Sequence, residues 1–364
     1  MTEEVYHDLQ KHLDQFPIGY PATKSGVEIR ILKHLFTPKE AEIATKLKWS
    51  YETVDDIHKN VEPNISTGEL EKTLDTMVSK GLINFKREGD KKHYAIIPLV
   101  VGIYEYQVNK LTKEFIEDFD QYKDNEFALE IISTKNLQVR IIPLEQSLTP
   151  ENQVASYDEI RKIIENTEED SIGLANCICR QLKDLQGQPC SRTSQRELCL
   201  YFRNTGRLFL DQGWARPITK DEALELLRNA EKEGLVLQSG NTKDPEFICC
   251  CCNCCCISLS KAKDIPRPAQ FLASNYYAVV DKELCTGCGT CLERCQMKAL
   301  KLVNDISKVN LKRCIGCGLC VSTCPEEAIQ LHKKDEEIEP PSTVEDLYAE
   351  IGNIKEDLRR KLNK

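Results

Sequence analysis

Two cysteine runs near the end of this 364-residue chain have residue types and a spacing suited to metal chemistry. The runs, at residues 285–295 and 314–324, each read C-x2-C-x2-C-x3-C, and their first cysteines lie 29 residues apart. Three cysteines spaced in this way can curl around one corner of an Fe4S4 cube, so that each thiolate reaches a different iron. Glycines such as Gly287 and Gly316 permit the tight turns that this requires. The spacing therefore predicts two [4Fe–4S] clusters.

The fourth cysteine of each run cannot reach the cube held by its own run, so we expect it to cross to the other cube. The predicted ligands of the first cluster are Cys285, Cys288, Cys291 and Cys324. The predicted ligands of the second cluster are Cys314, Cys317, Cys320 and Cys295. Zinc sites use paired C-x2-C knuckles instead, and disulfide frameworks belong to secreted chains. This is the spacing of a two-cluster bacterial ferredoxin, although Gln296 replaces the proline that usually follows the first run.

A second concentration of cysteines lies between residues 177 and 256, and seven of them fall within residues 249–256. Core packing does not explain this density, so we expect metal ligation. In an extended segment alternate side chains share a face, which would place Cys249 with Cys251 and Cys250 with Cys252. We predict one or two further clusters here, for a total of three or four, with a zinc site or partly unligated thiols as the alternatives. The candidate ligands are Cys177, Cys179, Cys190, Cys199, Cys249, Cys251, Cys252, Cys254, Cys255 and Cys256.

The chain resembles a family of multi-cluster ferredoxin-like proteins found in anaerobic bacteria and archaea. The resemblance covers nearly the whole chain and rests on "NCICR", Cys190, Cys199, "FICCCCNCCC", "SNYYAVVD" and the two cysteine runs. It implies a winged-helix-like N-terminus, a cysteine-rich middle domain, a C-terminal dicluster ferredoxin and iron–sulfur electron-transfer chemistry. Cys250 stands where the resemblance leads us to expect asparagine, so it is the least suited ligand of its run.

The length of the chain is too great for one core, so we expect several domains in an α+β arrangement. The predicted division is a winged-helix-like domain over 1–98, a mixed α/β cysteine-rich domain over 99–270 and a dicluster ferredoxin domain over 271–335. An acidic linker and an amphipathic helix over 336–364 complete the chain. This helix either packs on its own chain, which we favour, or docks a partner.

The N-terminal domain is expected to contain helices over 25–36, 37–48, 52–61 and 66–83, followed by a β-hairpin over 83–97 that turns at Glu88–Asp90. Thr37 and Glu40 form a predicted capping box. Residues 22–98 carry 13 Lys or Arg against 12 Asp or Glu, and the helix over 66–83 is acidic. Because phosphate contacts dominate DNA affinity, nucleic acid is an improbable partner, although lysines in the hairpin leave DNA binding as an alternative.

Further helices are expected over 111–122, over 156–168 with Ser156 as the cap, and from Thr219 to near Gly234. A strand is predicted over 137–144, and residues 171–180 should form a short strand that leads into a ligand loop. The C-terminal helix is expected to begin with a capping box of Ser342 and Glu345.

The chain carries 19 cysteines and a formal net charge of −9. No apolar stretch approaches a membrane span and the first residues are polar, so we expect a cytoplasmic protein whose free thiols serve metal clusters, in an anaerobe. The negative charge argues against nucleic acid and anionic membranes as partners. The expected partners are redox proteins, with the chain as an oligomer or as a subunit of a complex.

Three functions remain open on the sequence. The first is a one-electron carrier or an electron-transfer subunit of a larger anaerobic oxidoreductase, because fully ligated clusters leave no position for a substrate. The second is a redox-responsive winged-helix transcription regulator. The third is a reductase that works at a middle-domain cluster. No dinucleotide or P-loop motif and no Ser/His/Asp constellation is evident, so an electron-transfer protein is favoured over a stand-alone enzyme.

Overall fold

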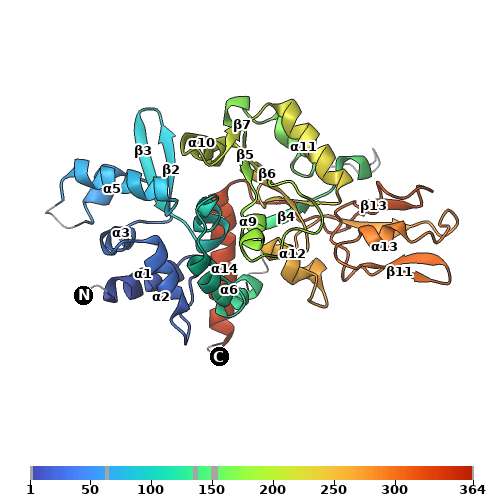
Figure 1. The fold of residues 1–364 in the computed structure, drawn as a ribbon, viewed down its shortest axis with the longest axis horizontal. Helices are drawn as coiled ribbons and strands as arrows, with labels where there is room; N and C mark the ends of the chain where they lie inside the picture. Colours follow the sequence, from blue (N-terminus) through green and yellow to red (C-terminus); the bar gives the residue numbers. More distant parts are fainter. Residues whose placement is uncertain (1–2, 62–64, 134–137, 149–154, 363–364) are drawn as a thin grey trace. The chain divides into compact units, whose positions relative to one another are not determined.

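The computed structural model describes residues 3–61, 65–133, 138–148 and 155–362, and the chain divides into two compact units (Figure 1). The N-terminal unit consists of residues 1–134 together with 348–364. The cysteine-rich unit consists of residues 135–347. The four-part division expected from the sequence is finer than this and stays a prediction.

Helices and one small antiparallel sheet begin the N-terminal unit. The helices are α1 (Glu4–Asp14), α2 (Val27–Leu35), α3 (Pro38–Ala44), α4 (Val54–His58) and α5 (Thr67–Lys80). The strands β1 (Glu52–Thr53), β2 (Ile83–Glu88) and β3 (Lys91–Ile96) pair in the order β1-β3-β2. The hairpin turns where predicted, but the helix expected over 52–61 begins with strand β1 and is shorter. The winged-helix assignment stays a prediction.

Local capping explains where helix α3 begins. The Thr37 hydroxyl accepts a hydrogen bond from the backbone N–H of Glu40, and the Glu40 carboxylate accepts one from the N–H of Thr37. This reciprocal pair confirms the predicted capping box. It satisfies two of the N–H groups that a helix start leaves without partners.

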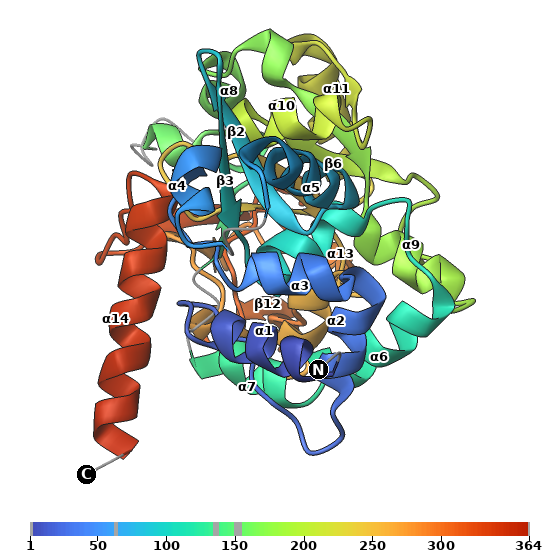
Figure 2. The same ribbon diagram turned by 90° about the vertical axis from the view of Figure 1, so that its left-hand side faces the viewer.

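The C-terminal helix packs on its own chain within the N-terminal unit. The helices that complete this unit are α6 (Lys113–Lys123), α7 (Glu126–Ser133) and α14 (Val344–Leu362), the last being the long helix of Figure 2. The ring of Tyr348 lies 4.2 Å from that of Trp49, and the Lys355 ammonium is 2.6 Å from the Glu130 carboxylate. The predicted cap was wrong by one residue, because Thr343 accepts the hydrogen bond from the N–H of Asp346.

A six-stranded antiparallel sheet is the frame of the cysteine-rich unit. Its order is β4 (Val139–Ile142), β8 (Val236–Gly240), β9 (Phe247–Cys251), β6 (Glu197–Tyr201), β5 (Gly173–Asn176) and β7 (Arg216–Pro217). The associated helices are α8 (Ile160–Glu165), α9 (Ile178–Leu185), α10 (Arg203–Asp211), α11 (Lys220–Lys232) and α12 (Ile257–Ala262). Apolar side chains of the sheet such as Leu198, Leu200 and Ile248 are buried and form part of the hydrophobic core of this unit.

Two sequence expectations for this unit need correction. The helix over 156–168 is shorter, because Ser156 begins a 3-10 turn (Ser156–Asp158) and Glu159 precedes α8. The segment expected to be a ligand loop after β5 is instead the start of helix α9, with Cys177 as the N-cap residue. The strand predicted over 137–144 corresponds to β4. The sequence also predicts a capping box of Thr219 and Glu222, and of its two bonds the structure has the one from the N–H of Glu222 to the Thr219 hydroxyl.

The last part of the cysteine-rich unit is built from short paired strands. Strand β10 (Tyr276–Val280) pairs with β13 (Ile329–Lys333), and β11 (Leu300–Val303) pairs with β12 (Ile306–Val309), both antiparallel. Helix α13 (Thr290–Arg294) lies between β10 and β11 in the chain. Short turns lie elsewhere in the chain at Leu99–Ile103, Glu105–Gln107, Glu145–Ser147, Glu169–Ser171 and Pro268–Gln270.

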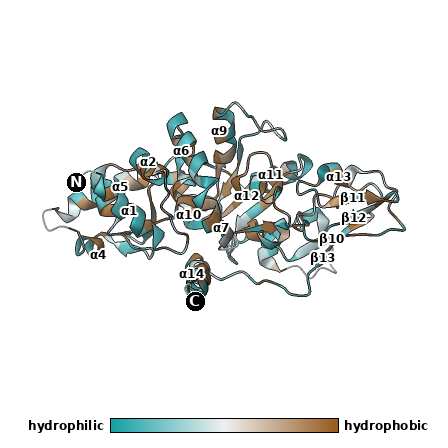
Figure 3. Cartoon of the chain, turned by 90° about the horizontal axis from the view of Figure 1, so that it is seen from below, coloured by the Kyte–Doolittle hydropathy of each residue, from teal (hydrophilic) through white to brown (hydrophobic). Residues whose placement is uncertain are grey.

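Many of the helices carry both polar and apolar residues, which Figure 3 shows as teal and brown segments in the same helix. Within the part of the chain that the structure describes, none of the helices has the length and apolar character needed to span a lipid bilayer.

Candidate metal centres

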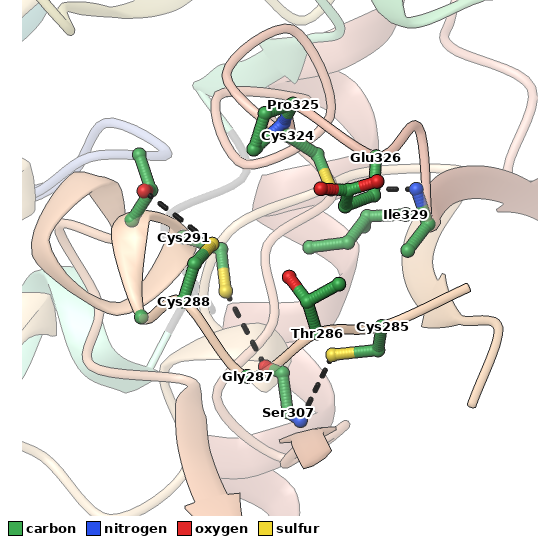
Figure 4. Close-up of a pocket in the computed structure, with 13 residues that line it drawn as sticks. Cys285, Thr286, Gly287, Cys288, Cys291, Ser307, Cys324, Pro325, Glu326 and Ile329 are labelled. Carbon is green, nitrogen blue, oxygen red and sulfur yellow. Dashed lines mark hydrogen bonds between the residues drawn. The ribbon is translucent and has the colours of Figure 1, made fainter. Parts of the chain in front are cut away.

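The first pocket of the dicluster region is lined by four cysteines from two distant segments (Figure 4). Cys285, Cys288 and Cys291 come from the loop and first turn around α13, and Cys324 comes from the end of the second cysteine run. The tandem spacing predicted this crossed set. Ligation of a metal cluster by these four residues stays a prediction that the shared pocket supports.

Backbone and hydroxyl groups surround the sulfurs of this first pocket. The N–H of Ser307 donates to Cys285 Sγ at 3.4 Å, and the N–H of Ala328 donates to Cys324 Sγ at 3.3 Å. The Ser307 hydroxyl lies 3.4 Å from Cys291 Sγ, and the Thr290 hydroxyl lies 3.6 Å from Cys288 Sγ. A thiolate in a cluster can only accept, so both hydroxyls would donate to it.

The second pocket is lined by Cys295, Cys314, Cys317 and Cys320, which again joins the fourth cysteine of one run to three of the other. The N–H of Ala278 donates to Cys314 Sγ at 3.4 Å, and the N–H of Ala299 donates to Cys295 Sγ at 3.2 Å. These two bonds are the counterparts of the two backbone bonds in the first pocket. Residues 29 positions apart therefore play the same part in both pockets.

The two pockets differ in exposure at corresponding cysteines. Cys288 is exposed, and hydrogen bonding from the backbone N–H of Thr290 lowers its pKa. Its counterpart Cys317 is partly covered, and burial raises its pKa to about 12. The backbone carbonyl of Cys317 also accepts a hydrogen bond from the N–H of Leu144 at 3.2 Å. The second pocket is thus covered by the segment that follows β4.

Positive backbone φ angles at glycine let each run turn back on itself. Gly287 and Gly316, 29 residues apart, have φ angles of +71° and +66°. A Cβ at Gly287 would collide with the backbone carbonyl of Asp305, and one at Gly316 with that of Tyr276. Only glycine fits a left-handed conformation this close to the backbone of another segment.

The sulfurs of six cysteines, four of them buried and two partly exposed, form a closed ring in the cysteine-rich unit. Each of these side chains is hydrogen-bonded to two others of the ring. The order around the ring is Cys177, Cys179, Cys256, Cys251, Cys249, Cys199 and back to Cys177. Hydrogen bonding from Cys179 lowers the pKa of both Cys177 and Cys256. These two thiols are the ones that the ring stabilises as thiolates.

Sheet register brings the ring together. Cys199 of β6 is the cross-strand partner of Cys249 of β9, and Cys251 lies two residues further along the same strand. Alternation along β9 therefore places Cys249 and Cys251 together, as the sequence indicated. The first turn of α9 supplies Cys177 and Cys179, and Cys256 precedes α12. The Gln238 side chain of β8 donates to Cys256 Sγ at 3.3 Å.

A second group of four sulfurs lies apart from the ring. Its members are Cys190, Cys252, Cys254 and Cys255, whose Sγ atoms all lie within 4.8 Å of one another. Cys190 belongs to the loop between α9 and β6, and the other three form the turn after β9. A hydrogen bond donated by the Cys255 thiol lowers the pKa of Cys252 to about 5. We refer to these residues as the four-sulfur group and to the other six as the six-sulfur ring.

Cys250 belongs to neither group, and the expected pairing of Cys250 with Cys252 is wrong. Strand β9 ends at Cys251, so Cys252 already lies in the turn and alternation no longer applies to it. Burial raises the pKa of Cys250 to about 12. Its carbonyl accepts a hydrogen bond at 3.0 Å from Arg180, whose other terminal nitrogen lies 3.5 Å from Cys252 Sγ.

Gln296 connects the second pocket to the four-sulfur group. It directly follows Cys295, and its Oε1 accepts a hydrogen bond from the N–H of Asn253 at 2.6 Å. Its Nε2 donates to the carbonyls of Gly234 and Cys251. Asn253 returns a bond to the Gln296 carbonyl at 2.7 Å. The residue that replaces the usual proline is therefore a fully buried bridge between two cysteine segments.

Residues 274–331 match the family model of the 4Fe-4S dicluster domain. No curated protein matches the chain. The matched region contains both pockets, and together with the clustered cysteines it shows that the chain carries at least two [4Fe–4S] clusters. The protein is an iron–sulfur electron-transfer protein, and such a function implies redox partners.

Several residues that shape these sites carried no direct signal in the sequence. Ser307 and Gln238 approach cysteine sulfurs from strands β12 and β8, and Thr290 does so from the first position of α13. Gln296 was noticed only as a departure from proline. One signal was available in the sequence: residues 29 positions apart occupy corresponding places in the two runs. This offset pairs Ser307 with Ala278 and Thr290 with Leu319, and so marks the hydroxyl residues that only the first pocket has.

Proposed function

We propose that the chain is a one-electron carrier, or the electron-transfer subunit of a larger oxidoreductase complex, in which the dicluster domain exchanges electrons with a further centre in the middle of the same unit. The observation that supports this proposal is the difference in exposure between the two dicluster pockets. One exposes Cys288, and the other is joined through Gln296 to the turn after β9. An exposed cluster suits exchange with a partner, and a covered one suits transfer inward.

The six-sulfur ring is the proposed third redox centre. A single tetrahedral ion takes four thiolates, whereas the ring offers six, of which four belong to buried residues and those of Cys179 and Cys249 to partly exposed ones. Six thiolates favour a polynuclear iron–sulfur centre. Burial, the hydrogen bond from Gln238 and the positive charge of Arg180 near Cys177 would tune its potential.

Iron, acid-labile sulfide and redox titration of anaerobically purified protein test this proposal. We expect more than the roughly eight irons that two cubes supply, and at least three reducible centres in electron paramagnetic resonance. Replacing Cys199 with Ser should remove the third centre and leave the two ferredoxin signals. The matched control is Cys250→Ser, a buried cysteine outside the ring, which should keep all centres. About eight irons and two centres in the native protein would contradict the third centre.

A DNA-binding role receives no support from the contacts of the N-terminal unit. Lys92 of the hairpin lies 3.0 Å from the Glu71 carboxylate and 2.7 Å from that of Asp75, both on α5. Lys86 lies 2.7 Å from the carboxylate of Glu88. These pairs neutralise positive charge that phosphates would need. We propose instead that this unit docks a protein partner, and a gel shift at low salt that retained DNA would contradict it.

A further inference from the structure

We propose that the four-sulfur group, Cys190, Cys252, Cys254 and Cys255, binds a single tetrahedral metal ion and not a [4Fe–4S] cube. The ion is of the thiolate-preferring class, zinc or iron. This assignment does not depend on the third redox centre proposed above, because it uses none of the six cysteines of the ring.

The distances between the four sulfur atoms support a site for a single ion. Cys190 Sγ lies 3.6 Å from Cys252 Sγ and 3.7 Å from Cys254 Sγ. Cys254 Sγ lies 3.4 Å from Cys252 Sγ and 3.7 Å from Cys255 Sγ. Four ligands at 2.3 Å from one tetrahedral ion stand about 3.8 Å apart. The group therefore has nearly the dimensions of a closed site for one ion.

A [4Fe–4S] cube requires its cysteine sulfurs to lie farther apart. Each of its four thiolates binds a different iron, so the sulfurs must stand apart on the outside of a cluster of eight atoms. Among the described residues, the four cysteines of neither dicluster pocket come together in this way, and only the four-sulfur group has all its ligand atoms within 4.8 Å. The same protein thus contains wide cysteine sets and one narrow set.

The surroundings fit a resident ion. Four thiolates around a divalent ion carry a net charge of −2, and the fully buried Arg180 guanidinium lies 3.5 Å from Cys252 Sγ. The turn that carries three of the ligands is fixed by the two hydrogen bonds between Asn253 and Gln296. Cys190 and Cys254 are partly exposed, which gives an ion a route into the site. Second-layer contacts of this kind orient metal ligands.

X-ray absorption at the zinc and iron edges of the native protein gives the first test. If zinc is bound, we expect a shell of four sulfurs near 2.3 Å with no neighbouring metal. If the ion is iron, we expect iron in excess of acid-labile sulfide by one atom per chain in the Cys199→Ser variant, which lacks the centre of the ring. Zinc at the edge with a mixed nitrogen or oxygen shell, or iron and sulfide in equal amounts in that variant with no zinc, would overturn the assignment.

The second test compares Cys254→Ser with the matched control Cys250→Ser. The first variant should lose one metal ion per chain without any loss of sulfide, and its ferredoxin signals should persist. The control should keep the ion. If Cys254→Ser loses irons together with an equal number of sulfides, the group holds a cube and this assignment fails, while the electron-transfer proposal stands. If Cys254→Ser cannot be obtained folded, the absorption result on native protein decides.

Discussion

The two pockets of the dicluster domain share one motif but differ in their surroundings. In both, three cysteines of one run meet the fourth of the other, and a backbone N–H from the same relative position reaches a sulfur. The first pocket exposes Cys288 and has two hydroxyls near its sulfurs. The second has alanine and leucine at the corresponding positions and is covered by Leu144 and its neighbours. The cysteine motif therefore determines which cluster is bound, and the surrounding residues determine whether that cluster is exposed to a partner or covered.

The largest predicted effect is a difference in melting temperature between the variants Cys317→Ser and Cys288→Ser. Each removes one of four ligands, so each should lose or degrade one of the two clusters, roughly four of eight irons. Loss of the covered cluster should also loosen the segment around Leu144 and lower the melting temperature of the protein more. Loss of the exposed cluster should leave the rest of the unit intact. Iron analysis and thermal melting measure both effects, and equal melting temperatures would contradict the described asymmetry.

Replacing Gln296 with Met should come next in size. The change keeps the volume but removes the three side-chain hydrogen bonds that Gln296 makes to Asn253, Gly234 and Cys251. Three buried groups left without partners cost about 1–3 kcal/mol each, and at about 2–4 °C per kcal/mol for a unit of this size the melting temperature should fall by about 6 °C or more. Leu319→Met, a buried apolar exchange beside the same cluster, is the control. A melting temperature no lower than that of the control would show that the bridge is not needed for stability.

A reciprocal exchange tests the hydroxyls. Ser307→Ala should lower the reduction potential of the exposed cluster, because a donor to its sulfur stabilises the more negative reduced form. Ala278→Ser should raise the potential of the covered cluster for the same reason. One net hydrogen bond of about 1 kcal/mol corresponds to about 40 mV for one electron. Redox titration followed by electron paramagnetic resonance measures both shifts, and shifts of the same sign would contradict this explanation.

The smallest effect concerns docking at the exposed pocket. Glu283 and Glu326 are exposed; Glu326 lines the first pocket, and Glu283 lies two residues before Cys285 in the chain. Replacing both with Gln should slow electron exchange with a cationic mediator about twofold at low salt and leave the cluster potential unchanged. The matched control, Asp221→Asn on α11, is exposed and should change nothing. A rate that stays constant would place electron exchange at another surface.

The dicluster pockets could be predicted from the sequence because their geometry is local. Six of the eight cysteines lie in two turns, and their spacing alone decides which sulfurs face the same cube. The fourth cysteine of each run cannot reach the cube of its own run, so it must serve the other one. The capping of α3 by Thr37 was likewise contained in a few neighbouring residues. In contrast, Ser156 and Ser342 have suitable side chains for caps, but the chain begins its helices elsewhere.

The division of the remaining cysteines could not be predicted, because it depends on sheet register. Alternation correctly paired Cys249 with Cys251, but only the pairing of β6 with β9 brings Cys199 beside them. The end of β9 separates Cys252 from Cys250, and no periodicity in a run of cysteines indicates where a strand stops. The contact of Cys190 with the turn joins residues 62 positions apart.

The exposed corner at Cys288 also determines how the protein would fail in air. Oxidants dissolved in water reach that corner before any covered sulfur, so the iron bound there should be the first to leave, converting the cube to a three-iron form. Samples handled briefly in oxygen should therefore lose their outward reactivity while the inner centres still take up electrons.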